Sequence, residues 1–226
     1  MRRRCIPSCA LTRRSCPWRR QSTRYTVRSR RRAATSPRLD NPAVPFTFSP
    51  LTQLPDIVLI RTTRHGDDRG WFVETYKKSA LAAAGINAEF RQDNHSFSAR
   101  PGTLRGLHFQ ITPAAQGKLV LVLSGEVFDV VVDLRNGATF GRWASVKLSG
   151  SEPTMLWVPE GFAHGFQTVA PDTAVTYKTT AEYSPTHERG ILWSDPQLAI
   201  PWPIADPVLS DRDRTWPPLA RESLSR

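Results

Sequence analysis

The run KLVLVLSGEVFDVVVDL, residues 118–134, decides the fold class of this chain. It consists of two apolar segments rich in valine and leucine, residues 118–123 and 126–134, on either side of Ser124-Gly125. Short segments of this composition, bounded by turn residues, are typical of β-strands. The two-residue separation also predicts that the two strands pair with each other as a hairpin.

Further strand-like segments occur on both sides of this run. They lie at residues 56–60, 69–76, 143–148, 155–158, 165–170 and 174–180. One short helix is expected at residues 79–84, ended by Gly85, and the part from Ser184 onward is expected to form loops and short helical turns. Many short strands separated by Gly and Pro turns favour an antiparallel sandwich or barrel over an α/β fold. We therefore predict an all-β protein with a few short helices.

The basic charge of the chain is confined to its first part. The 226 residues carry a formal net charge of +11, but residues 1–39 contain 13 arginines and no acidic residue, which leaves the remainder with a net charge of −2. We predict a disordered Arg-rich extension over residues 1–43 and one folded domain over residues 44–226. The extension fits an organelle transit peptide, a polyanion-binding arm or a segment without function.

All three cysteines also lie in the extension, at a spacing that matches no zinc site and no disulfide framework. No apolar run reaches the roughly 18 residues that a membrane helix needs. The sequence thus predicts a cytoplasmic protein with no membrane partner. The weakly acidic domain gives no reason to expect that it binds nucleic acid.

Two histidines stand in unusual surroundings. His108 lies in the strand-like run Arg105-Gly106-Leu107-His108-Phe109-Gln110, shortly before Lys118, and His164 lies in the glycine- and aromatic-rich run 159–166. A histidine alone in an apolar strand is more often a core residue that bonds to the backbone. Beside an arginine and a lysine, it suggests a buried base next to an anion-binding place.

Ten blocks in the same order carry a resemblance to a known family. They are residues 66–74, 90–96, 104–110, 115–120, 125–130, 139–141, 156–166, 177–178, 191–196 and 209–213. On these blocks the chain from about Asp56 to Leu219 resembles the dTDP-4-dehydrorhamnose 3,5-epimerases, which are cupins without a metal. The resemblance implies a double-stranded β-helix, or jelly roll, that forms a homodimer and uses no cofactor.

The resemblance implies inversion of C3 and C5 of a 4-keto-6-deoxy sugar linked to dTDP. His108 would remove the proton next to the ketone, and Asp213 would orient the imidazole. Lys118 would stabilise the enolate, Tyr177 would return a proton on the opposite face, and His164 would bind substrate or support the base. Taken alone, Lys118 fits a solvated strand edge equally well, Tyr177 fits the common role of filling a barrel interior, and Asp213 fits an exposed acid better than a catalytic one.

The resemblance also implies residues that bind the nucleotide. Arg69 and Arg105 match arginines that bind the phosphates, although either could instead pair with a nearby surface acid. Gln92 and Asn94 match polar residues beside the nucleotide sugar.

Two further residues match ones that reach the thymine across the dimer interface. They are Phe72 and Glu74. Without such a role, Phe72 would be a core residue of a strand and Glu74 would face the solvent. His65 replaces an aromatic residue that is frequent in the family, and this departure bears on the preference for thymidine.

Three alternatives remain open from the sequence. A metal-dependent cupin commonly needs an H-x-H pair, but residue 106, two before His108, is glycine, and no metal site is expected. A non-enzymatic module could bind nucleic acid through the Arg-rich extension. An epimerase acting at C3 only or at C5 only, in antibiotic sugar synthesis, would carry the same motifs.

Overall fold

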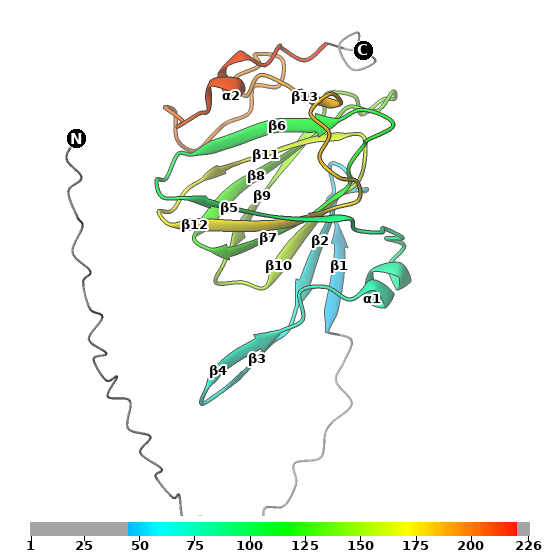
Figure 1. Cartoon of the computed structure of the whole chain (residues 1–226), viewed down its shortest axis with the longest axis vertical. Helices are drawn as coiled ribbons and strands as arrows, with labels where there is room; N and C mark the ends of the chain where they lie inside the picture. Colours follow the sequence, from blue (N-terminus) through cyan, green and yellow to red (C-terminus); the bar gives the residue numbers. More distant parts are fainter. Residues whose placement is uncertain (1–44, 221–226) are drawn as a thin grey trace, which may run out of the picture. The chain divides into compact units, whose positions relative to one another are not determined.

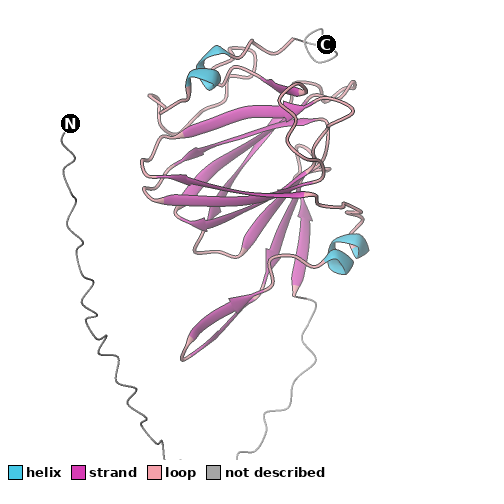
Figure 2. Ribbon diagram, in the orientation of Figure 1, coloured by secondary structure: helices cyan, strands magenta, loops and turns pink. Residues whose placement is uncertain are grey.

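The structure, a computed structural model, describes residues 45–220, and most of their regular structure is β-strand (Figures 1 and 2). The disorder predicted for residues 1–43 lies outside the described residues. Two antiparallel sheets face each other. The first has the order β1(Phe46–Pro50), β2(Val58–Thr62), β10(Thr154–Val158), β7(Lys118–Ser124), β12(Thr173–Thr179), β5(Gln92–Ser98). The second has the order β13(Glu188–Gly190), β6(Leu104–Gln110), β11(Phe162–Thr168), β8(Glu126–Asp133), β9(Trp143–Ser149).

The main core lies between these sheets. Side chains from both sheets form one buried cluster, which includes Val120, Val131, Leu156, Phe166 and Val175. Alternation along each strand sends one set of side chains into this layer and the other set outward. The predicted all-β jelly-roll fold is confirmed.

The predicted hairpin across Ser124-Gly125 is wrong. β7 pairs with β10 and β12 in the first sheet, whereas β8 pairs with β11 and β9 in the second. Gly125 has a φ of 72°, and a Cβ there would lie 2.2 Å from the Thr173 hydroxyl oxygen. This glycine therefore carries the chain from one sheet to the other. The apolar pattern is the same for a hairpin and for two strands that cover one core from opposite sides.

The predicted strand at residues 69–76 is only partly correct, because its strand portion, residues 70–73, is one half of a small hairpin. The hairpin is formed by β3(Arg64–Asp67) and β4(Gly70–Val73), which project from the sandwich as an arm (Figure 1). The predicted helix is α1(Lys78–Ala83), and the C-terminal part contains α2(Asp211–Thr215). Within residues 45–220, neither helix is long and apolar enough to cross a membrane.

A β-bulge interrupts the pairing of β6 with β11. His164 lies opposite His108 and Phe166 lies opposite Arg105, so two residues of β6 oppose the single Gly165. The extra residue re-aims the strand. As a result Arg105 and His108, three positions apart, face the same cavity.

Two glycines allow the strands to approach at this bulge. A Cβ on Gly165 would lie 2.8 Å from the carbonyl oxygen of Arg105, and one on Gly106 would lie 2.5 Å from the Gly165 Cα. Real Cβ contacts to backbone atoms are longer, so a side chain at either position requires β6 and β11 to separate.

We expect Gly165→Ala to lower the free energy of unfolding by about 1–3 kcal/mol, because overpacking at a rigid backbone contact is destabilising. Urea denaturation of the purified variant measures this. Gly137→Ala is the matched control, because a Cβ there meets nothing within 4 Å. An equal loss in the two variants would show that the close approach of β6 and β11 is not what makes Gly165 necessary.

Candidate active site

A cleft opens between the two sheets. It consists of two cavities of about 300 and 270 Å³, and both are lined by His108, Lys118, Tyr177 and Glu188. His108 and Glu188 belong to the second sheet, while Lys118 and Tyr177 belong to the first. The cleft thus combines a base, a cation and a phenol from opposite walls.

Strand alternation explains which residues of the first sheet reach the cleft. Lys118 of β7 lies beside Thr179 of β12, which places Lys118 and Tyr177 on the same face of this sheet. On the neighbouring strand β5, Asn94 lies beside Tyr177. These three polar residues therefore share the face of the sheet that lines the cleft, although they lie on three different strands.

His108 and Asp213 form a direct hydrogen bond. His108 Nε2 lies 2.5 Å from Asp213 Oδ1, although the two residues are 105 positions apart. Asp213 is held in turn by Ser210, whose hydroxyl donates to Oδ2 at 2.8 Å and accepts from the Asp213 amide at 3.1 Å as the N-cap of α2. Trp216 contacts the imidazole edge-on, with the ring centroids 6.0 Å apart. The imidazole is fixed by its partners before any substrate arrives.

The carboxyl group of Asp213 is kept ionised. Burial raises its pKa, but hydrogen bonds from His108 and Ser210, together with the charge of His108, outweigh this effect and lower the pKa below its usual value. An ionised carboxylate on one ring nitrogen directs the other nitrogen to act as the proton acceptor.

His164 forms a second imidazole–carboxylate pair. Its Nε2 lies 2.9 and 3.0 Å from the two carboxylate oxygens of Asp129, which is fully buried on β8. His164 lies directly opposite His108 and lines the cleft. Sequence reasoning missed Asp129, although an acid in the otherwise apolar run 127–132 was a usable signal, because carboxylates are rarely buried without a partner.

Lys118 is buried, and its environment makes the amine more acidic. Burial lowers the pKa of Lys118 from 10.5 to about 8, although the charges of Glu188 and Asp129 act in the opposite direction. Its Nζ donates to the carbonyl oxygen of His108 at 3.2 Å. Burial also raises the pKa of Tyr177, and only the positive charge of Arg105 acts to lower it. At neutral pH the site holds an ammonium and a protonated phenol.

A polar network at the rim was not predicted from the sequence. Glu188 accepts a hydrogen bond from the Tyr183 hydroxyl at 2.7 Å and forms an ion pair with Arg212. The same arginine donates to the Tyr183 hydroxyl at 3.2 Å. Because these residues lie in the irregular C-terminal part, no periodic pattern marked them.

The comparisons with known proteins agree with this geometry. Residues 51–221 match the family model described as dTDP-4-dehydrorhamnose 3,5-epimerase. The chain belongs to this family. Its members are epimerases and therefore isomerases, so the predicted enzyme class is confirmed.

Relatives described as 3,5-epimerases of dTDP-linked sugars span most of the chain. The enzyme of Pseudomonas aeruginosa is 51% identical over 164 residues, which cover 71% of this chain and 90% of that one. The solved epimerase of Bacillus anthracis, with TDP and PPi bound, is 47% identical, covers 77% of this chain and 99% of its own, and has a TM-score of 0.75. The Legionella pneumophila structure, in complex with dTDP-4-keto-L-rhamnose, is 42% identical, with coverages of 80% and 98% and a TM-score of 0.74.

The cleft of this epimerase contains some of the predicted nucleotide-binding residues. Arg105, Gln92 and Asn94 line it. The Gln92 side chain donates to Asn94 Oδ1 at 2.7 Å and accepts from the Tyr183 amide at 2.8 Å. Both ends of this amide thus have protein partners, which holds Asn94 and Tyr183 at the rim.

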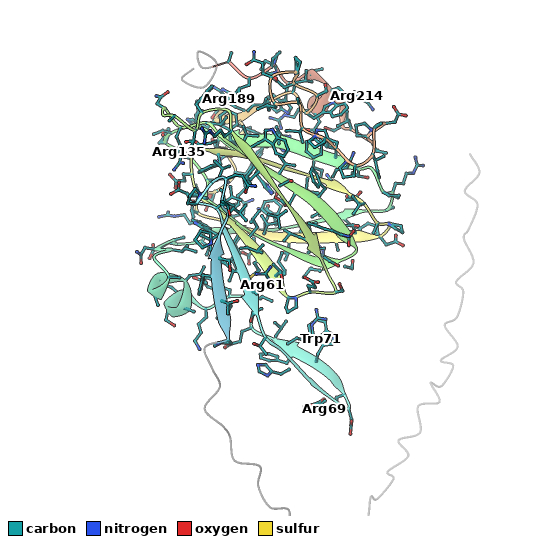
Figure 3. All side chains as sticks on the ribbon, turned by 180° about the vertical axis from the view of Figure 1, so that it is seen from behind. Arg61, Arg69, Trp71, Arg135, Arg189 and Arg214 are labelled. Atoms are coloured by element: carbon teal, nitrogen blue, oxygen red, sulfur yellow. The ribbon has the colours of Figure 1, made fainter. Side chains whose placement is uncertain are left out.

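The structure places Arg69, Phe72 and Glu74 outside the cleft, on the β3–β4 arm and just after it. Arg69 lies at the tip of the arm and forms an ion pair with Asp67 (Figure 3). Phe72 is not a core residue, since 67% of its surface is exposed. A separate cavity of about 560 Å³ is lined by Pro45, His65, Phe72, Glu74, Lys77, Ser79 and Ala80.

Among the described residues, no group of three or more His, Cys, Asp and Glu side chains is arranged to hold a metal ion. The acidic and imidazole groups of the cleft are instead engaged in pairs.

Proposed function

We propose that this epimerase inverts C3 and C5 of dTDP-4-dehydro-6-deoxy-D-glucose to give dTDP-4-dehydro-L-rhamnose, in the synthesis of dTDP-L-rhamnose. The observation that carries this proposal is the hydrogen bond between His108 and the ionised Asp213 inside a cleft that also contains Lys118 and Tyr177. Proton abstraction next to a ketone needs a base, a positive charge at the ketone oxygen and an acid on the other side of the ring.

In the proposed reaction His108 accepts the proton from the carbon next to the C4 ketone. The C–H electron pair moves to form the enolate, and the negative charge on O4 is stabilised by the Lys118 ammonium. The proton returns to the carbon from the opposite side, with Tyr177 as the donor at C5. His108 and Tyr177 project into the cleft from different sheets, which supports their action on opposite faces of the sugar.

Nucleotide binding is assigned to the remaining polar residues. Arg105, beside the base, suits the diphosphate through its guanidinium group, and His164 suits the sugar. We further propose a homodimer in which the arm of one subunit brings Arg69, Phe72 and Glu74 to the nucleotide of the other. Exposed aromatic surface on the arm supports this assignment, because large apolar patches are typical of interfaces.

Incubation with dTDP-4-keto-6-deoxyglucose in deuterated water tests the function. We expect deuterium at both C3 and C5, detected by mass spectrometry and NMR, because each inversion replaces a carbon-bound proton with one from solvent. Deuterium at only one carbon would identify a single-site epimerase. Its absence from both carbons would contradict the proposed chemistry.

A further inference from the structure

Asp195 is a buried carboxylate outside the cleft. Only 1% of its surface is exposed, and it lines neither of the two cavities described above. Its Oδ1 accepts from the amides of Gln197 at 2.7 Å and Leu198 at 3.2 Å, and its Oδ2 accepts from the amide of Leu219 at 2.5 Å. One carboxylate therefore joins the turn after Asp195 to a residue 24 positions later.

The segment that ends at Leu219 contains Asp213, one member of the proposed catalytic pair. Residues 210–219 begin at the Ser210 cap, contain Asp213 and Trp216, and end at the Leu219 amide held by Asp195. Between these ends, the Leu192 amide donates to the carbonyl oxygen of Pro217 at 2.8 Å. The segment is thus attached at its C-terminal end and near Pro217, and His108 lies against its middle.

The segment 210–219 is tightly packed against β13, so there is little room for it to move. Trp216 packs directly on the backbone of Gly190, where a Cβ would lie 2.3 Å from the indole ring. Gly190 is in turn the strand neighbour of His108. A shift of the segment away from β13 therefore moves both Trp216 and Asp213 relative to the imidazole.

We infer that Asp195 is a positioning residue for the epimerase reaction. By holding Leu219, its carboxylate keeps the segment 210–219 against β13 and so sets the contact of Asp213 with His108. This inference rests on the proposed role of His108 as the base. A displacement of about 1 Å in a reacting group is enough to slow catalysis by roughly 100-fold.

Asp195→Asn tests the inference in the full-length protein. The amide oxygen still serves Gln197 and Leu198, but the amide nitrogen then faces the Leu219 N–H, so two donors oppose each other. We expect kcat to fall by roughly 10- to 100-fold, with a smaller change in KM. An unchanged kcat, or a rise in KM alone, would overturn the inference.

A double-mutant cycle separates positioning from a general loss of structure. If Asp195 acts through Asp213, then Asp195→Asn changes kcat by less than about twofold when Asp213→Asn is already present. If Asp195→Asn lowers kcat by the same factor in the wild type and in Asp213→Asn, Asp195 does not act through Asp213. Should Asp195→Asn fail to fold, Leu219→Pro removes the amide donor from the other side, and the same two criteria apply.

Asp133→Asn is the matched control. Asp133 is also fully buried and accepts from a backbone amide, that of Arg135, at 2.9 Å, but the partners of its carboxylate, Arg135 and Thr139, lie outside the segment 210–219. We expect this variant to lose stability and keep kcat. The wild-type exchange reaction is run in parallel: no deuterium uptake there would reject the proposed function, whereas normal uptake with a fully active Asp195→Asn would reject only the positioning role.

Discussion

His108→Ala is expected to lower kcat/KM of the epimerase by about 10²- to 10⁴-fold, which is the usual contribution of a positioned general base. The variant loses the proton acceptor, while Lys118, Tyr177 and Arg105 stay on other parts of the cleft wall. Deuterium uptake at C3 and C5 of the substrate measures the loss directly. Binding of dTDP, measured by calorimetry, should change little, because the proposed phosphate contact is made by Arg105.

His95→Ala provides the matched control for this experiment. His95 lies on β5 between Asn94 and Ser96, is exposed, and points to the outer face of the sheet. The His95→Ala variant should therefore incorporate deuterium into the substrate at the wild-type rate. Full exchange in His108→Ala would place the base elsewhere in the cleft, and His164, directly opposite on β11, would be the first residue to test.

Lys118→Met is expected to give a protein that is more stable and far less active. Loss of the ammonium removes the charge that stabilises the enolate, and removal of one such group typically costs about 10²- to 10³-fold in kcat. Stability changes in the opposite direction. The folded protein lowers the pKa of Lys118 from 10.5 to about 8, so at pH 7 it carries an ammonium that its surroundings disfavour.

The expected gain in the free energy of unfolding at pH 7 is on the order of 2 kcal/mol. The lowering of the Lys118 pKa from 10.5 to about 8 corresponds to about 3 kcal/mol. The loss of the hydrogen bond from Lys118 to the His108 carbonyl reduces this gain by about 1 kcal/mol. Urea denaturation measures the difference. Lys178→Met is the control: this lysine pairs with Asp93 at 2.9 Å on the outer side of the sheet, and its loss should change stability by less than about 1 kcal/mol.

The pH dependence of both properties follows from the same group. Between pH 8 and 10.5 the unfolded chain binds more protons at this lysine than the folded chain does, so the stability of the wild type rises with pH across this window. Activity falls as pH rises through about 8, because Lys118 then loses its charge. Lys118→Met should show neither change. A wild-type kcat that stays constant to pH 10 would contradict the role of the ammonium.

The strand character of the domain and the positions of many strands could be predicted from the sequence because they depend on local patterns, but β1, β5 and β13 were not expected. The apolar runs at 118–123 and 126–134 correspond closely to β7 and β8, and the helix at 79–84 is displaced by one residue from α1. Pairing could not be predicted in the same way. Gly125 permits a tight hairpin as readily as a crossing between sheets, and only the partners β10, β11 and β12 decide which one forms.

The arrangement of the site was harder to predict from the sequence than the fold. Strict alternation along β6 puts Arg105 and His108 on opposite faces, and only the bulge opposite Gly165 brings both into the cleft. The pairing of His108 with Asp213 spans 105 residues and could be inferred only from the family resemblance. No periodic pattern marked Glu188 or Arg212, because they lie in segments whose conformation is set by tertiary contacts.

The division of the reacting groups between two sheets links catalysis to the interior of the protein. The imidazole stands on one wall and the ammonium and phenol stand on the other, so the gap between them is set by the side chains packed in the layer beneath, such as Val120, Phe166 and Val175. Trimming one of these residues would let the walls settle toward each other and would misalign acid and base without removing either. Substitutions of core residues between the two sheets should therefore lower turnover, as substitutions in the lining of the cleft do.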